Sequence, residues 1–403
     1  MTSLTESLSP KRPTVGIMFS DKEMKVCQVI TRRIVGGAQE NTILTCEGLA
    51  RRGHDVTLIT GPPLGPEGQL MDRALAGSYR VIVVDSLRRP ISPLRDRAAY
   101  RSLLRHLRQL RPDIVHSHSS KAGILARKAA ARIGGMKIVH TVHGLPFHRY
   151  ESWWRNRLYV ALERRAARRS DAIISVADAM TEQALAAGVG RREQYTTIYS
   201  GMEVEQFLNR TSAADEFRDS LELPADAVLV TQVSRLFHLK GHEFIIAAAE
   251  KIADPRVHFC FVGDGLLREQ IEAEIPRRGL GGRFYLTGLL PPEQMPAVMH
   301  ASDIIVHCSL REGLARTLPQ AMLAGKPVVS FDIDGAREVV DQQTGVLLQP
   351  KDVRGLKVAI EALAASPDIR ARLGSAGRKR CREMFDHNRM VEQIEGLYRR
   401  FLQ

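Results

Sequence analysis

Short apolar runs alternate with helical segments along most of this chain, and that alternation restricts the folds it can adopt. The runs are rich in valine and isoleucine and are bounded by polar residues or glycine, which is typical of buried strands. They cover Lys25–Ile30, His54–Thr60, Tyr79–Asp85, Asp113–His118, Lys137–Val142 and Asp171–Val176, and then Val228–Val233, Val257–Val262, Phe284–Leu286, Ile304–Val306 and Val328–Phe331. Strands that alternate with helices predict parallel sheets covered by helices on both faces, an α/β fold.

The length indicates two domains, because 403 residues are more than one hydrophobic core usually organises. The alternation runs in two series, and residues 195–210 between them read as strand, turn and connection. We therefore predict a flexible tail at residues 1–24, a first domain at 25–205, a second domain at 206–385 and a final helix within 386–403.

The five cysteines are scattered, and no two have the spacing of a zinc or redox site. Reduced, buried thiols in a cytosolic protein are therefore expected. No apolar run has the length of a transmembrane helix, and the N-terminal residues lack the apolar core of a signal peptide. We predict a cytoplasmic protein whose contact with the plasma membrane, at its inner face, is peripheral.

The positive charge is concentrated in the first half of the chain. The whole chain carries +13, whereas residues 1–210 hold 33 basic and 19 acidic side chains, a net +14. Arginines line a helix at residues 95–110, and another basic helix opens with Trp153 and Trp154. An anionic membrane surface fits this asymmetry, and a merely solvated basic face is the alternative. Nucleic acid would also fit the charge, but the chain has no recognition module, so no nucleic-acid partner is expected.

The stretch from Ser309 to Val340 is the most informative part of the sequence. A buried strand runs into the loop Arg311-Glu312-Gly313, and a helix then starts near Thr317. Gly325 and Pro327 end that helix, as a glycine followed by a proline should. Loops at the carboxyl ends of parallel strands hold anions when they open into a helix. A carboxylate beside a glycine there suggests a polyhydroxylated ligand that carries a phosphate.

Other strands of the second series end in loops suited to the same ligand. Arg235 and Lys240 follow one strand and would supply two fixed cations. The alternative interpretation is a pair of solvated bases on the surface. Gly263-Asp264-Gly265 and Thr287-Gly288 follow two more strands, where a nucleotide base or ribose could lie against the backbone.

The first series has two matching loops. Gly36 and Gly37 start a helix after the first strand and would let backbone N–H groups approach a phosphate, although a tight turn alone would also need glycine. His143 and Gly144 end the Lys137–Val142 strand, so the histidine should face the cleft, unless it only bonds a neighbouring loop.

Taken in order, these loops resemble those of the family 4 retaining glycosyltransferases, the glycosyl transferases group 1, from about Lys25 onward. That resemblance implies the GT-B fold, in which two Rossmann-like domains face each other across a cleft and the last helix crosses back to the N-terminal domain. It implies a nucleotide-diphosphate sugar bound by the C-terminal domain and an acceptor bound mostly by the N-terminal domain.

The resemblance also assigns site residues. Arg235 and Lys240 match the family's diphosphate-binding pair, Glu312 matches the first glutamate of its Glu-x7-Glu motif, and His143 matches the histidine near the reacting sugar. Together these four form the expected catalytic set. The expected donor-binding set is Gly36, Gly37, Gly263, Asp264, Gly288, Gly313, Arg316, Thr317 and Gln320. Gln320 stands where the family has its second glutamate, so weaker nucleotide binding or a different donor is expected.

No metal ion or other cofactor is expected, since two cations and helix N-termini can stabilise a departing nucleoside diphosphate. Asp332-Ile333-Asp334 spells a metal motif of another glycosyltransferase fold, but it lies at the end of the Val328–Phe331 strand and is discounted. The charge and the aromatic helix favour a lipid-linked or membrane-proximal glycan acceptor, as in cell-envelope or exopolysaccharide synthesis. The alternatives are a nucleotide-sugar epimerase on the same fold and a Rossmann oxidoreductase, which lacks its G-x-G-x-x-G fingerprint here.

Overall fold

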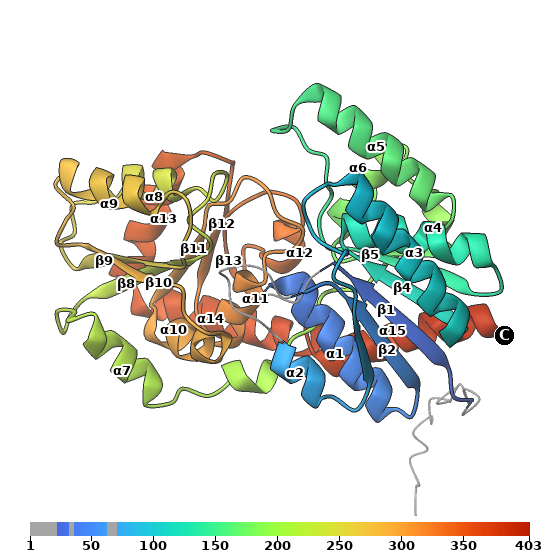
Figure 1. Cartoon of the computed structure of the whole chain (residues 1–403). Helices are drawn as coiled ribbons and strands as arrows, with labels where there is room; N and C mark the ends of the chain where they lie inside the picture. The colour runs from blue at the N-terminus through green and yellow to red at the C-terminus, as the bar shows by residue number, and fades with distance from the viewer. Residues whose placement is uncertain (1–21, 32–35, 63–70) are drawn as a thin grey trace, which may run out of the picture.

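The computed structural model describes residues 22–31, 36–62 and 71–403, which form two α/β lobes side by side (Figure 1). Of the predicted tail at residues 1–24, all but the last three residues lie outside the described residues. The two lobes each contain one parallel sheet, which confirms the predicted fold class.

The N-terminal lobe contains a seven-stranded parallel sheet in the order β3-β2-β1-β4-β5-β6-β7. Its strands are β1 Lys25–Ile30, β2 Asp55–Thr60, β3 Arg80–Val83, β4 Ile114–His118, β5 Lys137–Val142, β6 Ala172–Ser175 and β7 Tyr195–Thr197. The order reverses between β1 and β4, which is where an open α/β sheet forms a crevice at the carboxyl ends of its strands.

The C-terminal lobe contains a six-stranded parallel sheet in the order β10-β9-β8-β11-β12-β13. Its strands are β8 Val228–Val233, β9 Val257–Val262, β10 Phe284–Gly288, β11 Ile304–His307, β12 Val328–Phe331 and β13 Gly345–Leu348. The order reverses between β8 and β11, so the loops that carry Lys240 and Glu312 leave from neighbouring strands. Strand β13 has no counterpart among the strands predicted from the sequence.

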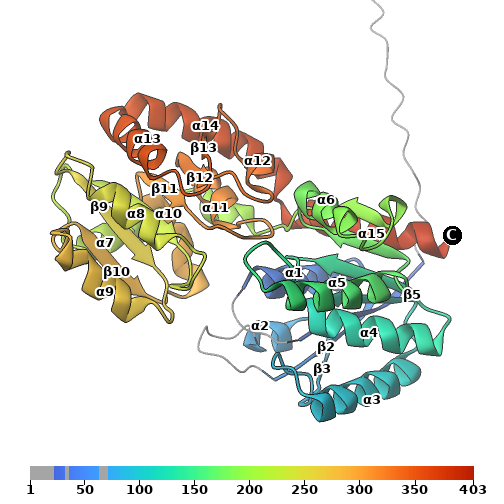
Figure 2. The ribbon, with the colours of Figure 1, turned by 90° about the horizontal axis from the view of Figure 1, so that it is seen from above.

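Helices cover both faces of each sheet (Figure 2). In the first lobe they are α1 Gly37–Arg51, α2 Met71–Ala76, α3 Pro93–Leu110, α4 Ser120–Ile133, α5 Trp153–Ala167 and α6 Asp178–Ala186, with the 3-10 turn η1 Arg192–Gln194. After η2 Val204–Phe207 they are α7 Ala213–Ser220, α8 His242–Ala249, α9 Arg268–Arg277, η3 Pro292–Gln294, α10 Met295–Ala301, α11 Thr317–Leu323, α12 Ala336–Val339, α13 Val353–Ala365, α14 Pro367–Met384 and α15 His387–Leu402. The predicted boundary at 205/206 falls inside η2 and remains a prediction.

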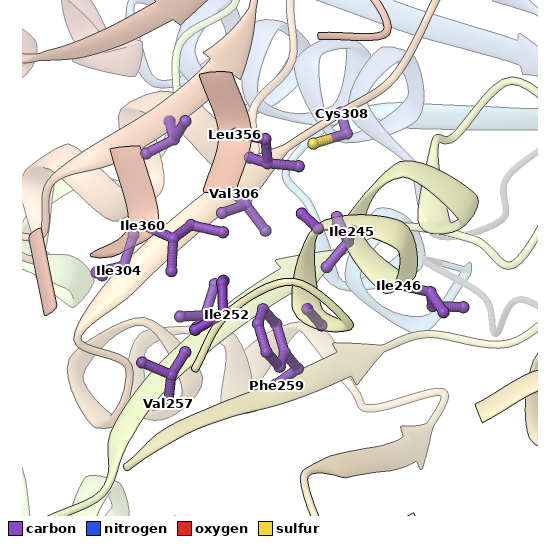
Figure 3. Close-up of a cluster of buried hydrophobic side chains, with 14 of the residues drawn as sticks. Ile245, Ile246, Ile252, Val257, Phe259, Ile304, Val306, Cys308, Leu356 and Ile360 are labelled. Atoms are coloured by element: carbon purple, nitrogen blue, oxygen red, sulfur yellow. The ribbon is translucent and has the colours of Figure 1, made fainter. Parts of the chain in front are cut away.

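The core of the C-terminal lobe lies between its sheet and helices α8 and α13 (Figure 3). Strand residues such as Val306 are fully buried because both faces of a parallel sheet are covered. Phe259 stacks on Phe284 with ring centroids 4.8 Å apart. This packing holds the strand ends in place, and with them the loops of the site.

The last helix, α15, returns to the N-terminal lobe and packs against α1 (Figure 1). Asp386 caps it by accepting a hydrogen bond from the Asn388 N–H, and its apolar face joins the N-terminal core. Gly48 permits the close approach of α1, because a Cβ there would lie 2.6 Å from Val391. The return of the final helix, which the family resemblance implied, is therefore present.

Candidate active site

A cavity of about 730 Å³ lies between the lobes, at the carboxyl ends of both sheets. Its wall contains eleven of the thirteen predicted site residues, and these are Gly36, Gly37, His143, Arg235, Lys240, Gly263, Glu312, Gly313, Arg316, Thr317 and Gln320. The two switch points of the parallel sheets therefore open into one space, as the fold requires for a site shared by two lobes.

Glu312 and Lys240 meet in this cavity. The Lys240 Nζ donates to Glu312 Oε1 at 2.5 Å, and His307 Nε2 lies 3.4 Å from the same oxygen. Burial disfavours the charged carboxyl, but the Lys240 ammonium and His307 outweigh burial and lower the pKa of Glu312 well below its usual range. Glu312 is therefore an anion beside a cation, ready to accept hydrogen bonds from hydroxyl groups.

The backbone around this pair is held by two contacts. Gln232 donates through Nε2 to the Lys240 carbonyl at 3.0 Å and accepts from the Cys308 N–H at 3.2 Å, which ties the β8 loop to the end of β11. Gly241 has φ 78°, and a Cβ there would lie 1.9 Å from the Cys308 carbonyl oxygen. Only glycine fits this close approach, because both the left-handed conformation and the space exclude a side chain.

Arg235 follows β8 on the same wall, and its guanidinium lies 4.9 Å from the Phe237 ring centroid. Gly263 allows this loop to pass close by, since a Cβ there would lie 2.1 Å from the Ser234 carbonyl oxygen. The C-terminal lobe thus presents two cations and a glycine loop to the cavity, which suits a diphosphate.

Arg316 crosses the cavity to the N-terminal lobe. Its guanidinium donates to Glu40 Oε1 at 2.7 Å and lies 3.4 Å from the Gly37 carbonyl oxygen. Gly313 also touches the other lobe, because a Cβ there would lie 2.0 Å from the His143 carbonyl oxygen. The start of α1 is therefore in direct contact with the loop that follows β11, although no local pattern in the sequence relates them.

His143 lies between two spaces. It lines the interlobe cavity and a smaller cavity of about 270 Å³ inside the N-terminal lobe. Burial, followed by the Arg316 guanidinium, lowers the pKa of His143 to about 3, so the imidazole is neutral at physiological pH. A neutral histidine here can orient a sugar hydroxyl without adding charge to the site.

Two predicted donor-binding residues are not on the cavity wall of the described chain. The Asp264 carboxylate accepts from the Gly265 N–H at 2.7 Å, and the Gly288 carbonyl accepts from the Gly263 N–H at 2.9 Å. Both residues shape the loop that carries Gly263, and their role in donor binding remains a prediction. Leu289, Leu290 and Met295 occupy the neighbouring wall instead.

His307 was missed by the sequence analysis. It ends β11, is 3% exposed, and contacts Glu312. The rule that selected His143, a histidine at the carboxyl end of a parallel strand, would have selected His307 as well. No sequence pattern pointed to Gln232, because a sequence does not show which group a polar residue inside an apolar strand will bind.

The two aspartates of the discounted metal motif accept hydrogen bonds from a backbone N–H and from neighbouring side chains. Asp334 accepts from the Glu312 N–H at 2.7 Å and from Gln183 at 2.9 Å, while Asp332 accepts from Arg337. Among the residues that the structure describes, no three His, Cys, Asp or Glu side chains are grouped so that they could hold a metal ion.

The chain matches two family models, described as "Glycosyltransferase Family 4" over residues 35–206 and "Glycosyl transferases group 1" over residues 213–380. It is 29% identical to the 2-deoxystreptamine N-acetyl-D-glucosaminyltransferase of Streptomyces fradiae, over 87% of this chain and 90% of that protein. It is 28% identical to the UDP-Gal:alpha-D-GlcNAc-diphosphoundecaprenol alpha-1,3-galactosyltransferase of Escherichia coli, over 93% and 97%.

Two solved structures are similar to this chain over almost its whole length. Anabaena Alr3699/HepE, in complex with UDP and glucose, superposes with a TM-score of 0.80 at 25% identity and covers 93% of this chain and 99% of its own. The sucrose-phosphate synthase of Thermosynechococcus elongatus superposes with a TM-score of 0.81 at 21% identity, over 94% and 99%, and is similar in fold.

Proposed function

Because the chain belongs to the family 4 glycosyltransferases with the GT-B fold, we propose that it is a retaining enzyme that uses a nucleotide-diphosphate sugar and a lipid-linked or membrane-proximal glycan acceptor. The observation that carries the donor assignment is the meeting of Lys240 and Glu312, at 2.5 Å, in the cavity that Arg235 and the start of α1 also line. The family and the relatives favour sugar transfer over the epimerase and the oxidoreductase.

In this proposal the diphosphate lies against Arg235 and Lys240, and the ionised Glu312 accepts hydrogen bonds from the donor sugar. The fifteen-residue helix α1 starts on the opposite wall with the N–H groups of Gly37 and Ala38, where its dipole favours negative charge. The helix behind Glu312, α11, has seven residues and contributes a smaller dipole. The cations would stabilise the departing nucleoside diphosphate, and we propose that no metal ion is needed.

Nucleotide binding is tested by thermal denaturation in the presence of a panel of nucleoside diphosphates and monophosphates. We expect one diphosphate to raise Tm by a few degrees and its monophosphate to do much less, because the second phosphate is what two cations would hold. Lys240→Ala should abolish the shift, and Lys251→Ala, which removes an exposed lysine of the same lobe, should keep it. No shift with any nucleotide would contradict the proposal, and a sugar product formed without an acceptor would favour the epimerase.

The same assay tests Gln320. In Gln320→Glu we expect the preferred diphosphate to bind about three to ten times more tightly, because a carboxylate accepts ribose hydroxyls with charge assistance. Gln393→Glu adds the same charge at an exposed site on α15 and is the matched control. Equal affinity in all three proteins would mean that Gln320 does not contact the nucleotide.

The acceptor proposal is supported by the surface formed by α3, α4 and α5, which pack on one another in that order. Large apolar side chains project from it, at Ile91, Leu94, Trp153, Trp154, Leu158 and Leu162, and are 37–83% exposed. Helices α3 and α5 also carry exposed arginines, at positions 95, 97, 101, 105, 108, 155, 157, 164 and 165. Apolar side chains among cations complement an anionic lipid surface. Among the described residues, no helix is long and apolar enough to cross a bilayer.

We expect the protein to float with vesicles that contain anionic lipid at low salt, and to float less with neutral vesicles or at high salt. The double variant Trp153→Ala/Trp154→Ala should reduce the floated fraction several-fold. Leu266→Ala/Val358→Ala removes exposed apolar side chains from the C-terminal lobe and should leave flotation unchanged. If the wild-type protein stays at the bottom at low salt, a soluble acceptor becomes the better proposal.

A further inference from the structure

A chain of hydrogen bonds connects His143 at the cavity to the last helix. His143 Nε2 lies 3.0 Å from His118 Nδ1, and His118 Nε2 lies 2.8 Å from Gln28 Oε1. Gln28 Nε2 donates to the Tyr398 hydroxyl at 3.0 Å. That hydroxyl lies 2.5 Å from His116 Nδ1, and His116 Nε2 lies 2.7 Å from the Thr141 hydroxyl. We call these residues the histidine chain, and its members are His143, His118, Gln28, Tyr398, His116 and Thr141.

The interior members of the histidine chain are fully buried. Gln28, His116, His118 and Tyr398 are each at most 1% exposed. Burial, followed by the neighbouring histidine His143, lowers the pKa of His116 to about 3, and burial likewise lowers the pKa of His118 well below its usual range. Each imidazole is therefore neutral and has one N–H and one lone pair, so its hydrogen bonds have a direction.

The Gln28 amide sets that direction. Its oxygen can only accept, so His118 carries its proton on Nε2 and presents the Nδ1 lone pair to His143. His143 must then donate from Nε2. On the other side, the Gln28 NH₂ group can only donate, so the Tyr398 oxygen accepts from it and the Tyr398 O–H donates to His116. Every bond in the histidine chain points the same way, from His143 toward Thr141.

The consequence appears at the second ring nitrogen of His143. With its proton on Nε2, Nδ1 carries the lone pair. Nδ1 has no hydrogen-bond partner among the described residues and is not one of their buried unpaired atoms, so among these residues it is accessible, on a side chain that lines both the interlobe cavity and the smaller cavity. An acceptor at that point selects a ligand group that donates, such as a sugar hydroxyl, and disfavours a carboxylate.

We propose that Tyr398 is a positioning residue that acts through Gln28 and His118 to hold His143 as the Nε2–H tautomer, with Nδ1 ready to accept a hydroxyl of the bound sugar. The assignment of the ligand as a sugar rests on the proposed function. The helix that crosses from the C-terminal lobe thus controls the hydrogen-bonding character of a residue in the N-terminal lobe, 255 positions earlier in the chain.

The tautomer is measured on ligand-free protein labelled with ¹⁵N-histidine, because the ¹⁵N shift separates an N–H nitrogen from one with a lone pair. The signals that disappear in His143→Gln belong to His143. We expect its Nε2 to be protonated and its Nδ1 to be unprotonated in the wild type. In Tyr398→Phe, which leaves the Gln28 NH₂ group without its acceptor, we expect a mixture of both tautomers. An Nδ1–H tautomer in the wild type, or wild-type shifts retained in Tyr398→Phe, would overturn the proposal.

Kinetics separate positioning from a structural role. Tyr398→Phe should lower kcat/KM about tenfold, the value of one ordinary hydrogen bond, with unchanged affinity for the nucleoside diphosphate. Tyr285→Phe is the control, because it removes a hydroxyl 3.4 Å from His258 Nδ1 in the other lobe. It should change neither kcat/KM nor the affinity for the nucleoside diphosphate. A weaker nucleotide affinity in Tyr398→Phe would indicate general damage and count against positioning. If Tyr398→Phe does not fold, an Nδ1–H tautomer in the wild type would still overturn the proposal. Because that tautomer is read without substrate, failure of the transferase assignment would leave it untouched.

Discussion

Replacing Glu312 with alanine is expected to lower kcat/KM about a thousandfold while Tm stays within a few degrees of the wild type. The carboxylate is ionised and held by Lys240 at 2.5 Å, and in the proposed function it accepts hydrogen bonds from the donor sugar. Removing one preorganised charged group from a site of this kind costs about 10²–10³ in rate, and the proposed contact with the sugar would be lost as well. Steady-state kinetics and a melting curve measure both effects.

The affinity for the nucleoside diphosphate should behave differently. Glu312 partly neutralises Lys240, so its removal leaves more positive charge for the diphosphate, and binding of the nucleotide should be unchanged or tighter. Glu312→Gln preserves the shape and isolates the charge. Glu269→Ala, on the exposed face of α9, is the control for removal of a glutamate from the same lobe. Near-normal turnover in Glu312→Ala would mean that the motif was misread.

The N-terminal lobe should lose stability steeply in mild acid. His116, His118 and His140 are 0–3% exposed, and in each case burial is the main cause that lowers the pKa below the ordinary 6.5. Below pH 6.5 the unfolded chain binds protons that the folded chain excludes, so the free energy of unfolding falls as the pH falls. Each histidine contributes about 1.4 kcal/mol per pH unit. These three and His143, whose pKa is lowered to about 3, together contribute about 5 kcal/mol per pH unit below pH 6.

Urea unfolding followed by circular dichroism between pH 7.5 and pH 5 measures this slope. His116→Gln should reduce the slope of the N-terminal lobe by about a quarter, whereas His238→Gln, which replaces an exposed histidine, should not change it. His242 and His300 are also buried and act in the same direction in the C-terminal lobe. A midpoint that does not change between pH 7 and pH 5 would contradict the packing of these side chains.

Most of the strands, and helices α11 and α15, could be predicted from the pattern of residues within each segment. The helix expected near Thr317 is α11, Thr317–Leu323, and the final helix expected within 386–403 is α15, His387–Leu402. Both have local signals, namely the Gly325 and Pro327 stop and the Asp386 cap. β13 was missed because Gly345–Leu348 is four residues long and begins with glycine, so its only strong strand signal is its pairing with β12.

Some features of the candidate site could be predicted from the sequence and others could not, and the reason is physical. Lys240 and Glu312 were found because each follows a strand and sits beside a glycine, features that lie within a few residues. The bond between Arg316 and Glu40 joins residues 276 positions apart, and no local pattern relates them. The exposure of Trp153 could not be predicted either, because the sequence of a helix does not show which of its faces the sheet will cover.

The sequence by itself therefore determined the alternation of strands and helices and the chemistry at the strand ends, because burial of apolar residues and the turning of the backbone depend on neighbours along the chain. Only the tertiary structure decided what those ends face. The order of the strands, the closing of the two lobes and the return of α15 bring Tyr398 to Gln28 across 370 positions. A buried hydrogen bond of that kind acquires a partner and a direction only after the surrounding core has packed.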